Sequence, residues 1–361
     1  MLFTMNTNAP QELKLKKKRA GLTDTNLLLI ITIAVFFVMY TCAVVFLGEG
    51  FERPQSFFNI LNDNAYLIIL SCGMTLVMIT GGIDISVGQV TSLVAMCCAV
   101  YLDRDIISPD KYNTPGTPLV AMLIALAIGL GFGLVQGFLV AYLEIQPFIV
   151  TLAGLFFAKG MTTIVYAKQF NVANESFKKI KETRIEIPGM GSTIHNNYMP
   201  AYIEIGVVVA LVIVILLFAL LRWTKIGRSF YAVGGNNQSA NMLGINVKRT
   251  KFAAHVMCGL LAGIGGFVFF MNVGCGSPTN AAGAEMNAIA SSIVGGTMLT
   301  GGVGNIIGTF FGVLSMSTIK NIVASLGLDG AWWTNITVAA MLCLFLLVQS
   351  VLLSRKNKAK K

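Results

Sequence analysis

Long apolar runs recur along the whole chain, and they limit how it can fold more than any other feature. A helix needs about 20 apolar residues to cross the roughly 30 Å hydrocarbon core of a bilayer, and these runs approach or exceed that length. Of the 361 residues, 55% are hydrophobic and only 12% are charged. Soluble domains carry about 25% charged residues, which excludes the chain from that class. We predict an all-α polytopic membrane protein.

Nine apolar runs have clear limits, and a tenth is short and interrupted by glycine. The nine are Leu27–Leu47, Ala65–Thr80, Val87–Leu102, Pro118–Leu143, Phe148–Ala167, Ala201–Leu221, Phe252–Val273, Asn305–Leu326 and Trp332–Leu353. The tenth is Ala288–Leu299, whose length leaves a full crossing open. We expect about ten transmembrane helices in a domain that covers 25–353, between an N-terminal tail, 1–24, and a C-terminal tail, 354–361.

Basic residues predict the orientation, because basic loops stay on the cytoplasmic side of a membrane. Lysine and arginine gather before the first run, after the last run and in the loop 222–251. These clusters share one side only if the tenth run crosses, so we predict that both termini are cytoplasmic. Acidic residues favour the opposite loops; they are Glu49, Glu52, Asp103, Asp105, Asp110 and Asp329. The net charge of +10 therefore reflects topology and does not call for nucleic acid as a partner.

The first apolar run differs from a cleaved signal peptide. It is too long for one, and no small-residue cleavage motif follows it. We therefore expect it to be the first membrane helix.

No motif of catalysis or metal binding is present in the sequence. The cysteines lie mostly within apolar runs, where small packing residues are expected, and they lack metal-ligand spacing. The histidines, His195 and His255, are far apart, and no Ser-His-Asp, His-Glu-x-x-His or Walker A pattern occurs. We predict a protein that is not an enzyme, holds no metal and binds no cofactor or ATP by itself.

Charged residues within the apolar runs are few, although ion-driven transporters usually mark their ion path with them. The candidates are Asp84, Lys159, Glu204 and Lys320. Glu204 and Lys320 lie near helix ends and can extend to the interface. Lys159 lies deeper and is a candidate for binding a substrate hydroxyl or a nearby carbonyl. Asp84 is interpreted as a helix cap, with Ser86 as a rival capping residue.

The basic loop 222–251 contains a segment with helical periodicity. Ala240, Leu243 and Gly244 share one face if Asn237 or Ser239 caps a short helix. A small amphipathic helix on the cytoplasmic side suits the docking of a soluble partner. An ordinary basic loop is the alternative interpretation.

A short sequence occurs twice, as Ile79-Thr80-Gly81-Gly82-Ile83 and as Leu299-Thr300-Gly301-Gly302-Val303. A further glycine follows each copy at the same spacing, at Gly88 and Gly308. Both copies follow runs that cross in the same direction, so they are candidates for parallel repeats, which transporters often contain. A chance match of two glycine-rich turns is the alternative. We assign Gly81, Gly82, Asp84, Gly301 and Gly302 to structural turns.

Four motifs together resemble the permease subunits of bacterial ABC sugar importers, in the branch that takes up ribose, xylose and galactose. They are GMTLVMITGGIDISVG (73–88), QPFIVTLAGLFF (146–157), IGRSFYAVGGNNQSANMLGINV (226–247) and IVGGTMLTGGVGNIIGT (293–309). The resemblance covers about 25–350. Within the branch, NILNDNAYL (59–67) and GAWWTNI (330–336) are most similar to the galactofuranose permease.

The resemblance implies a type II importer fold in a bacterial inner membrane. It implies three protein partners, namely a second permease subunit, a cytoplasmic ATPase that uses the ATP, and an extracytoplasmic sugar-binding protein. It also implies that one segment enters a cleft of the ATPase. Its coupling residues are Gly234, Gly235, Asn236, Ala240, Gly244 and Ile245.

The chain departs from the family pattern at two positions and in one loop. Asn287 stands where the family has an aspartate before the eighth span, and Lys320 replaces a neutral polar residue. The outer loop, 168–200, is long. These departures leave the substrate open.

A neutral sugar needs a path with uncharged donors and acceptors, so we expect polar residues at depth to line it. The candidates are Asn64, Gln89, Gln136, Thr151 and Lys159. For each, a hydrogen bond between helices is the alternative. An ion-coupled secondary transporter is the rival class of function, and it should show a relay of buried carboxylates. A membrane-embedded enzyme is a second rival.

Overall fold

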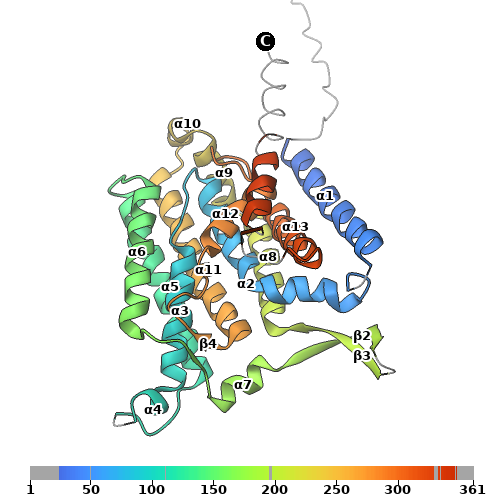
Figure 1. Cartoon of the computed structure of the whole chain (residues 1–361). Helices are drawn as coiled ribbons and strands as arrows, with labels where there is room; N and C mark the ends of the chain where they lie inside the picture. Colours follow the sequence, from blue (N-terminus) through green and yellow to red (C-terminus); the bar gives the residue numbers. More distant parts are fainter. Residues whose placement is uncertain are drawn as a thin grey trace, which may run out of the picture.

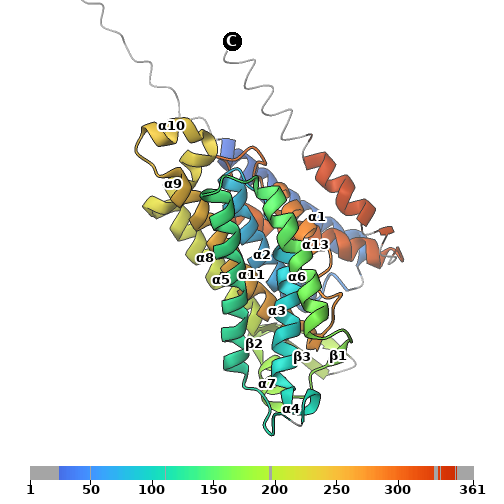
Figure 2. The same ribbon diagram turned by 90° about the vertical axis from the view of Figure 1, so that its left-hand side faces the viewer.

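A computed structural model describes residues 24–48, 50–109, 111–194, 197–328, 332–333, 335–345 and 347. The helices form a bundle with α10 at one end and α4, α7 and a β-hairpin at the other (Figures 1 and 2). The helices are α1 (Asp24–Leu47), α2 (Pro54–Ile79), α3 (Val87–Leu102), α4 (Arg104–Ile107), α5 (Pro118–Ala141), α6 (Pro147–Val165), α7 (Glu175–Lys181), α8 (Ile205–Trp223), α9 (Lys225–Gly235), α10 (Asn237–Met242), α11 (Val247–Val273), α12 (Ala284–Val294) and α13 (Ile306–Ser325).

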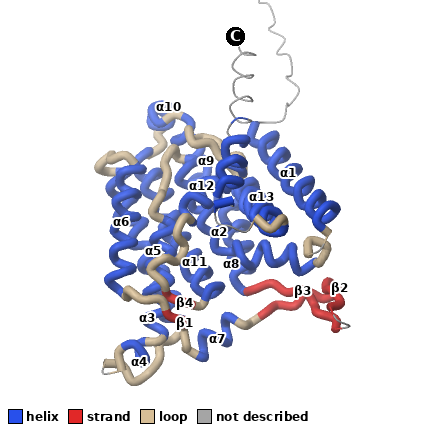
Figure 3. Tube along the Cα trace, in the orientation of Figure 1, coloured by secondary structure: helices blue, strands red, loops and turns tan. Residues whose placement is uncertain are grey.

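Two small antiparallel sheets lie at the hairpin end (Figure 3). Strand β1 (Phe170–Asn171) pairs with β4 (Cys275–Gly276), and β2 (Arg184–Ile194) pairs with β3 (Asn197–Glu204). The long loop 168–200 is therefore folded into β1, α7 and most of the β2–β3 hairpin.

Seven helices in the described part of the chain are long and apolar enough to cross a membrane. They are α2, α5, α6, α8, α11, α13 and the Leu29–Leu47 part of α1. Two shorter apolar helices, α3 and Asn335–Phe345, accompany them. The structure thus supports a polytopic membrane protein, and the count of about ten crossings stays a prediction. The predicted tails 1–24 and 354–361, apart from Asp24, lie outside the described residues, as do His195, Glu49, Asp110 and Asp329.

The predicted start of the second run, at Ala65, is wrong. Helix α2 begins at Pro54, with proline in its first turn, where the missing N–H has no helical partner to lose. The polar stretch that contains Asn59 and Asp63 concealed this half of the helix in the sequence. The predicted start at Ala201 is also wrong, because Ala201 belongs to β3 and the helix begins at Ile205.

The tenth run folds as a broken segment. Helix α12 has 11 residues, which gives about 16 Å at 1.5 Å per residue and cannot span the core alone. Before it, β4 lies beside β1 at the hairpin end, and after it, the Gly302 N–H donates to the Ile79 carbonyl near the other end (Figure 1). The chain from β4 to Gly302 therefore consists of turns on either side of one short helix, and in this it resembles the discontinuous helices of transporters.

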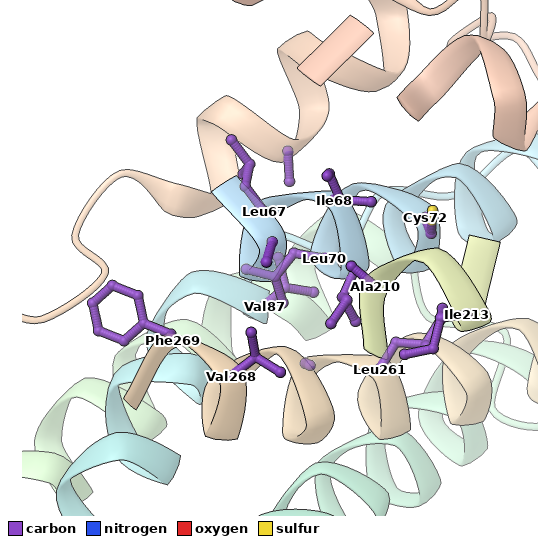
Figure 4. Packing of buried hydrophobic residues seen from close by; sticks show 14 of the residues in the cluster. Leu67, Ile68, Leu70, Cys72, Val87, Ala210, Ile213, Leu261, Val268 and Phe269 are labelled. Carbon is purple, nitrogen blue, oxygen red and sulfur yellow. The ribbon is translucent and has the colours of Figure 1, made fainter. Parts of the chain in front are cut away.

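Helices α2 and α11 form the centre of the bundle, where α2 is largely buried. Leu70 of α2 and Val268 of α11 belong to one core with Ala210 of α8 (Figure 4). Small residues let α11 and α5 approach closely, since a Cβ on Gly129 would overlap the carbonyl of Gly259. Such packing is typical of membrane helices. Apolar side chains on the outer faces remain exposed, such as Ile164 of α6, which is 76% exposed.

Candidate functional site

Three chain segments meet through backbone atoms near the α10 end, at a contact that we name the glycine junction (Ile79, Gly81, Gly234, Gly301 and Gly302). The Gly302 N–H donates to the Ile79 carbonyl at 2.8 Å. A Cβ on Gly234 would overlap this same carbonyl and come 2.5 Å from the Gly302 nitrogen. A Cβ on Gly301 would come 3.0 Å from the Cα of Gly81. The end of α9 is thus seated on both glycine turns.

The two copies of the repeated sequence occupy comparable positions. Gly81 and Gly301 both have φ +83°, a conformation that glycine adopts without strain. Gly88 and Gly308 both face α12, at opposite ends of that helix: a Cβ on Gly88 would overlap the carboxylate of Glu285, and one on Gly308 the carbonyl of Gly295. The second glycines differ, because Gly302 has φ +74° and Gly82 does not have a positive φ. Helix α12 therefore lies between Gly88 and Gly308, the glycines that follow the two copies.

Helix α10 projects beyond the junction at the end of the bundle (Figure 2). Its N-cap is Asn236, whose Oδ1 accepts from the Ser239 N–H at 2.8 Å, so the predicted caps Asn237 and Ser239 were wrong. It ends at Met242, and two residues later Gly244 has φ +79°, where the Ile245 N–H donates to the Ala240 carbonyl at 3.0 Å. This is the usual glycine stop of a helix.

The expectation that Ala240, Leu243 and Gly244 share one face of the helix is wrong, because Ala240 is buried, Leu243 is exposed and Gly244 lies beyond the end of α10. Ala240 is 2% exposed and packs inward, because the short helix buries its small residue against the bundle. The exposed apolar side chains are instead Met242 and Leu243, at 86% and 79%. Met242 was missed by sequence reasoning, although a methionine and a leucine before a stop glycine in a basic loop were a visible signal.

A groove of about 380 Å³ lies beside α10, between the α5–α6 turn and the start of α11. Asn237, Lys248 and Lys251 line it, together with Glu144. The Glu144 carboxylate accepts from Lys248 Nζ at 2.9 Å, and this hydrogen bond and charge hold the pKa of Glu144 below its usual range. Both side chains are exposed, so this ion pair contributes little to holding the α5–α6 turn against the start of α11.

Asp84 is not the helix cap that we expected; the rival residue Ser86 occupies the N-cap position of α3, although its side chain makes no capping hydrogen bond. It is 2% exposed, and its Oδ1 accepts from the Ser86 hydroxyl at 2.6 Å and from the Ser86 N–H at 3.0 Å, which closes a tight turn before α3. Gln136 of α5 donates to the Ser86 hydroxyl at 2.9 Å. Thr151 of α6 donates to the carbonyls of Pro147 at 2.9 Å and Ile83 at 3.3 Å. Gln136 and Thr151 therefore hold the turn in place.

His255 joins this buried group and was missed by sequence reasoning. Its Nδ1 lies 2.9 Å from the Lys251 carbonyl, and Asp84 lies within electrostatic reach of the ring. Its Nε2 is buried and has no partner among the described residues. A histidine within an apolar run was the only signal that the sequence offered.

The other three candidate path residues lie elsewhere. Asn64 donates to Ser317 Oγ of α13 at 2.7 Å. Gln89 is buried on α3, next to Gly88. Lys159 is exposed on α6, within electrostatic reach of Glu285. The structure thus does not bring the five candidates into one cavity.

The two residues that depart from the family pattern contact each other. Lys320 Nζ donates to Asn287 Oδ1 at 3.3 Å. The two residues that differ from the family pattern therefore meet at one contact between α12 and α13. Just before Asn287, the buried carboxylate of Glu285 has Oε2 without a partner among the described residues.

Comparisons with known proteins identify relatives over most of the chain. The family described as "Branched-chain amino acid transport system / permease component" matches residues 56–346. The chain is 35% identical to the inner membrane ABC transporter permease protein YjfF of Escherichia coli K12, over 90% of this chain and 92% of that protein. It is 32% identical to the fructose import permease protein FruG of Bifidobacterium longum, over 97% and 98%. It is 32% identical to the ribose import permease protein RbsC of Escherichia coli K12, over 84% and 88%. No solved structure matches the chain.

Proposed function

Because the chain belongs to the branched-chain amino acid transport system / permease component family, we propose that it forms the translocation path for a monosaccharide in an ATP-driven importer. Its relatives are permease components of transporters, and the chain is accordingly a transport subunit in the membrane rather than an enzyme. ATP is hydrolysed on a separate ATPase subunit in this proposal.

The glycine junction is the observation that carries the proposal. A partner bound to the exposed Met242 and Leu243 would push or pull on α10 and α9, and Gly234 at the end of α9 contacts both glycine turns. These turns continue into α3 and α13. A force from a soluble ATPase therefore has a contiguous route into two parts of the bundle, as a bistable transport domain needs. In this arrangement the α10 end is cytoplasmic.

The coupling surface of the proposal differs in part from the one the sequence predicted. Met242 and Leu243 supply the apolar contact, while Gly244 and Ile245 terminate α10 and Asn236 starts it. Ala240 and Gly234 attach the helix to the bundle. Gly235 is exposed, and no atom lies within 4 Å of the position that a Cβ on it would occupy.

Galactofuranose is the substrate that we propose first, on the resemblance of 59–67 and 330–336 to the galactofuranose permease. The relatives named for fructose and ribose support a monosaccharide more broadly, and ribose, xylose or galactose is the alternative. An extracytoplasmic binding protein would deliver the sugar. A second, homologous permease subunit would complete the path.

Uptake into membrane vesicles tests the class of function. Vesicles that hold the chain with the partners encoded beside its gene should accumulate labelled sugar when ATP is supplied inside, and an uncoupler should not stop them. A variant ATPase that binds but cannot hydrolyse ATP is the control. Uptake that needs no ATP and collapses with the uncoupler would establish the secondary transporter instead.

Purification tests the subunit composition. A tagged copy of this chain should bring down a different, homologous permease together with the ATPase. A fully active complex with two copies of this chain and no other permease would contradict the second-subunit proposal.

A further inference from the structure

An open polar pocket of about 330 Å³ lies between α2 and α13, which we name the α2–α13 pocket. Its volume falls at the lower end of the range of about 300–1,000 Å³ that is common for small-molecule sites. The lining residues are Gly50, Phe51, Ser56, Asn59, Asp63, Asn321, Ala324 and Ser325. Apart from Gly50, Phe51 and Ala324, these residues present amide, hydroxyl or carboxylate groups.

Two pairs of side chains face each other across the pocket. Asn59 and Asp63 are four residues apart on α2, and Asn321 and Ser325 are four apart on α13, so each pair forms a polar ridge on one helix face. All four residues are exposed. The pocket is therefore a slot with hydrogen-bonding groups on both walls.

These groups are only partly engaged within the protein. Asn59 Oδ1 accepts from Gln55 at 2.7 Å, and the Ser325 hydroxyl donates to the Asn321 carbonyl at 2.9 Å. In the part of the chain that the structure describes, the Asp63 carboxylate has neither a hydrogen bond nor an ion pair, and the Asn321 amide has no hydrogen bond. Acceptors and donors thus remain for a ligand.

The chemistry of the lining selects among ligand classes. It contains one carboxylate and no lysine or arginine, which disfavours an anion. A calcium site would need six to eight oxygen ligands, usually from several carboxylates. A ring with several hydroxyl groups offers both donors and acceptors, and it matches amides and a carboxylate on opposite walls.

Further polar contacts join the same two helices inside the bundle. Asn64 of α2 contacts Ser317 of α13 at 2.7 Å. Further along, Thr75 of α2 contacts Thr309 of α13 at 2.6 Å and Ser292 of α12 at 3.1 Å. Hydrogen bonds of this kind hold membrane helices together. In the pocket, by contrast, polar side chains of the same two helices are exposed.

We propose that the α2–α13 pocket binds a neutral monosaccharide directly and is a sugar subsite on the permease itself. The proposal rests on the proposed transport function. Asp63 and Asn321 bind ring hydroxyls from opposite walls, with Asn59 and Ser325 beside them. On the α2 side the pocket is lined by Asn59 and Asp63, which belong to the segment 59–67 that resembles the galactofuranose permease.

The first test measures sugar binding to the purified permease complex in lipid nanodiscs without the binding protein. Saturation-transfer NMR with galactose, ribose, xylose and fructose as probes should show saturation transfer from the complex to at least one sugar. A sample without sugar is the blank. Asp63→Asn and Asn321→Ala should each weaken that signal about tenfold in apparent affinity, as expected when a hydrogen bond to a charged or buried group is lost. Glu182→Gln and Asn171→Ala, exposed residues at the hairpin end, are the matched controls.

The second test separates this inference from the transport proposal. In ATP-driven vesicles, Asp63→Asn and Asn321→Ala should raise the sugar concentration for half-maximal uptake about tenfold, with unchanged ATP hydrolysis in the absence of sugar. Normal uptake by both variants would overturn the subsite and leave the transport function standing. Loss of the second permease from the purified complex in either variant would show that the pocket is a subunit interface, which also overturns the subsite.

Discussion

At the glycine junction three chain segments touch through backbone atoms, whereas in the α2–α13 pocket two helices present polar side chains that remain available. The first contact leaves no room for a methyl group, because Gly234 lies against the Ile79 carbonyl. The second holds about 330 Å³ of open space. A close backbone contact transmits movement and is sensitive to volume, while an open polar slot binds a ligand and is sensitive to chemistry. Substitutions should therefore separate the two regions by kind of effect.

The largest effect is expected at Gly234. Gly234→Ala places a methyl group on the Ile79 carbonyl and next to the Gly302 nitrogen, so either α9 lifts off the turns or the turns separate. We expect uptake in vesicles to be abolished. Gly235→Ala is the matched control, because no atom lies within 4 Å of its would-be Cβ, and it should transport normally. Equal activity of both variants would show that the junction carries no movement.

The second effect is expected at the exposed end of α10. Burial of a large apolar side chain contributes about 1.5–3 kcal/mol, so Met242→Asp and Leu243→Asp should each weaken ATPase binding at least tenfold. Uptake should fall while membrane insertion stays normal. Asn241→Asp, an exposed polar neighbour, is the control. Co-purification of the ATPase with the double variant at the wild-type ratio would place the docking surface elsewhere.

A smaller effect is expected where Gln136 holds the Asp84 turn. Gln136→Leu removes the donor to the buried Ser86 hydroxyl and should destabilise the protein by about 1–3 kcal/mol. A lower unfolding temperature of the purified protein would measure this loss. The exposed Gln146→Leu should leave that temperature unchanged. A neutral result at position 136 would mean that solvent replaces the bond.

The smallest effect is expected at the exposed pair of Glu144 and Lys248. Lys248 lowers the pKa of the Glu144 carboxyl in the folded protein, so any stabilisation is present above the unfolded-state pKa and is lost as pH falls through the folded-state pKa. Solvent screening at this exposed site should make Glu144→Gln indistinguishable from the parent in thermal unfolding at neutral and acidic pH. A clearly lower unfolding temperature of this variant at neutral pH alone would show that the ion pair stabilises the contact between the α5–α6 turn and the start of α11.

The sequence was informative where a pattern follows from the backbone alone. The repeated glycine turns were recognised from five residues, and Gly81 and Gly301 share the conformation that only a glycine adopts easily. The apolar runs located most helices. Residue patterns failed where tertiary contacts decide, because nothing in the sequence shows that Ala240 faces inward or that Ser86, rather than Asp84, occupies the N-cap position of α3.

The α2–α13 pocket shows the other kind of failure. Asn59 and Asp63 interrupt the apolar pattern, so the first half of α2 looked like a loop although it is helical. The same polar side chains that concealed the helix in the sequence line the pocket. Hydrophobic patterns are least informative where a membrane helix carries polar residues.

Helix α12 lies between Gly88 and Gly308, one at each end. An α-helix has a fixed rise per residue, so α12 keeps a constant length between these two glycines. If the segment that contains Gly88 shifts along this axis, the segment that contains Gly308 must shift with it or lose its contact. Shifts of the two segments along this axis are therefore coupled for as long as α12 keeps its contacts with Gly88 and Gly308.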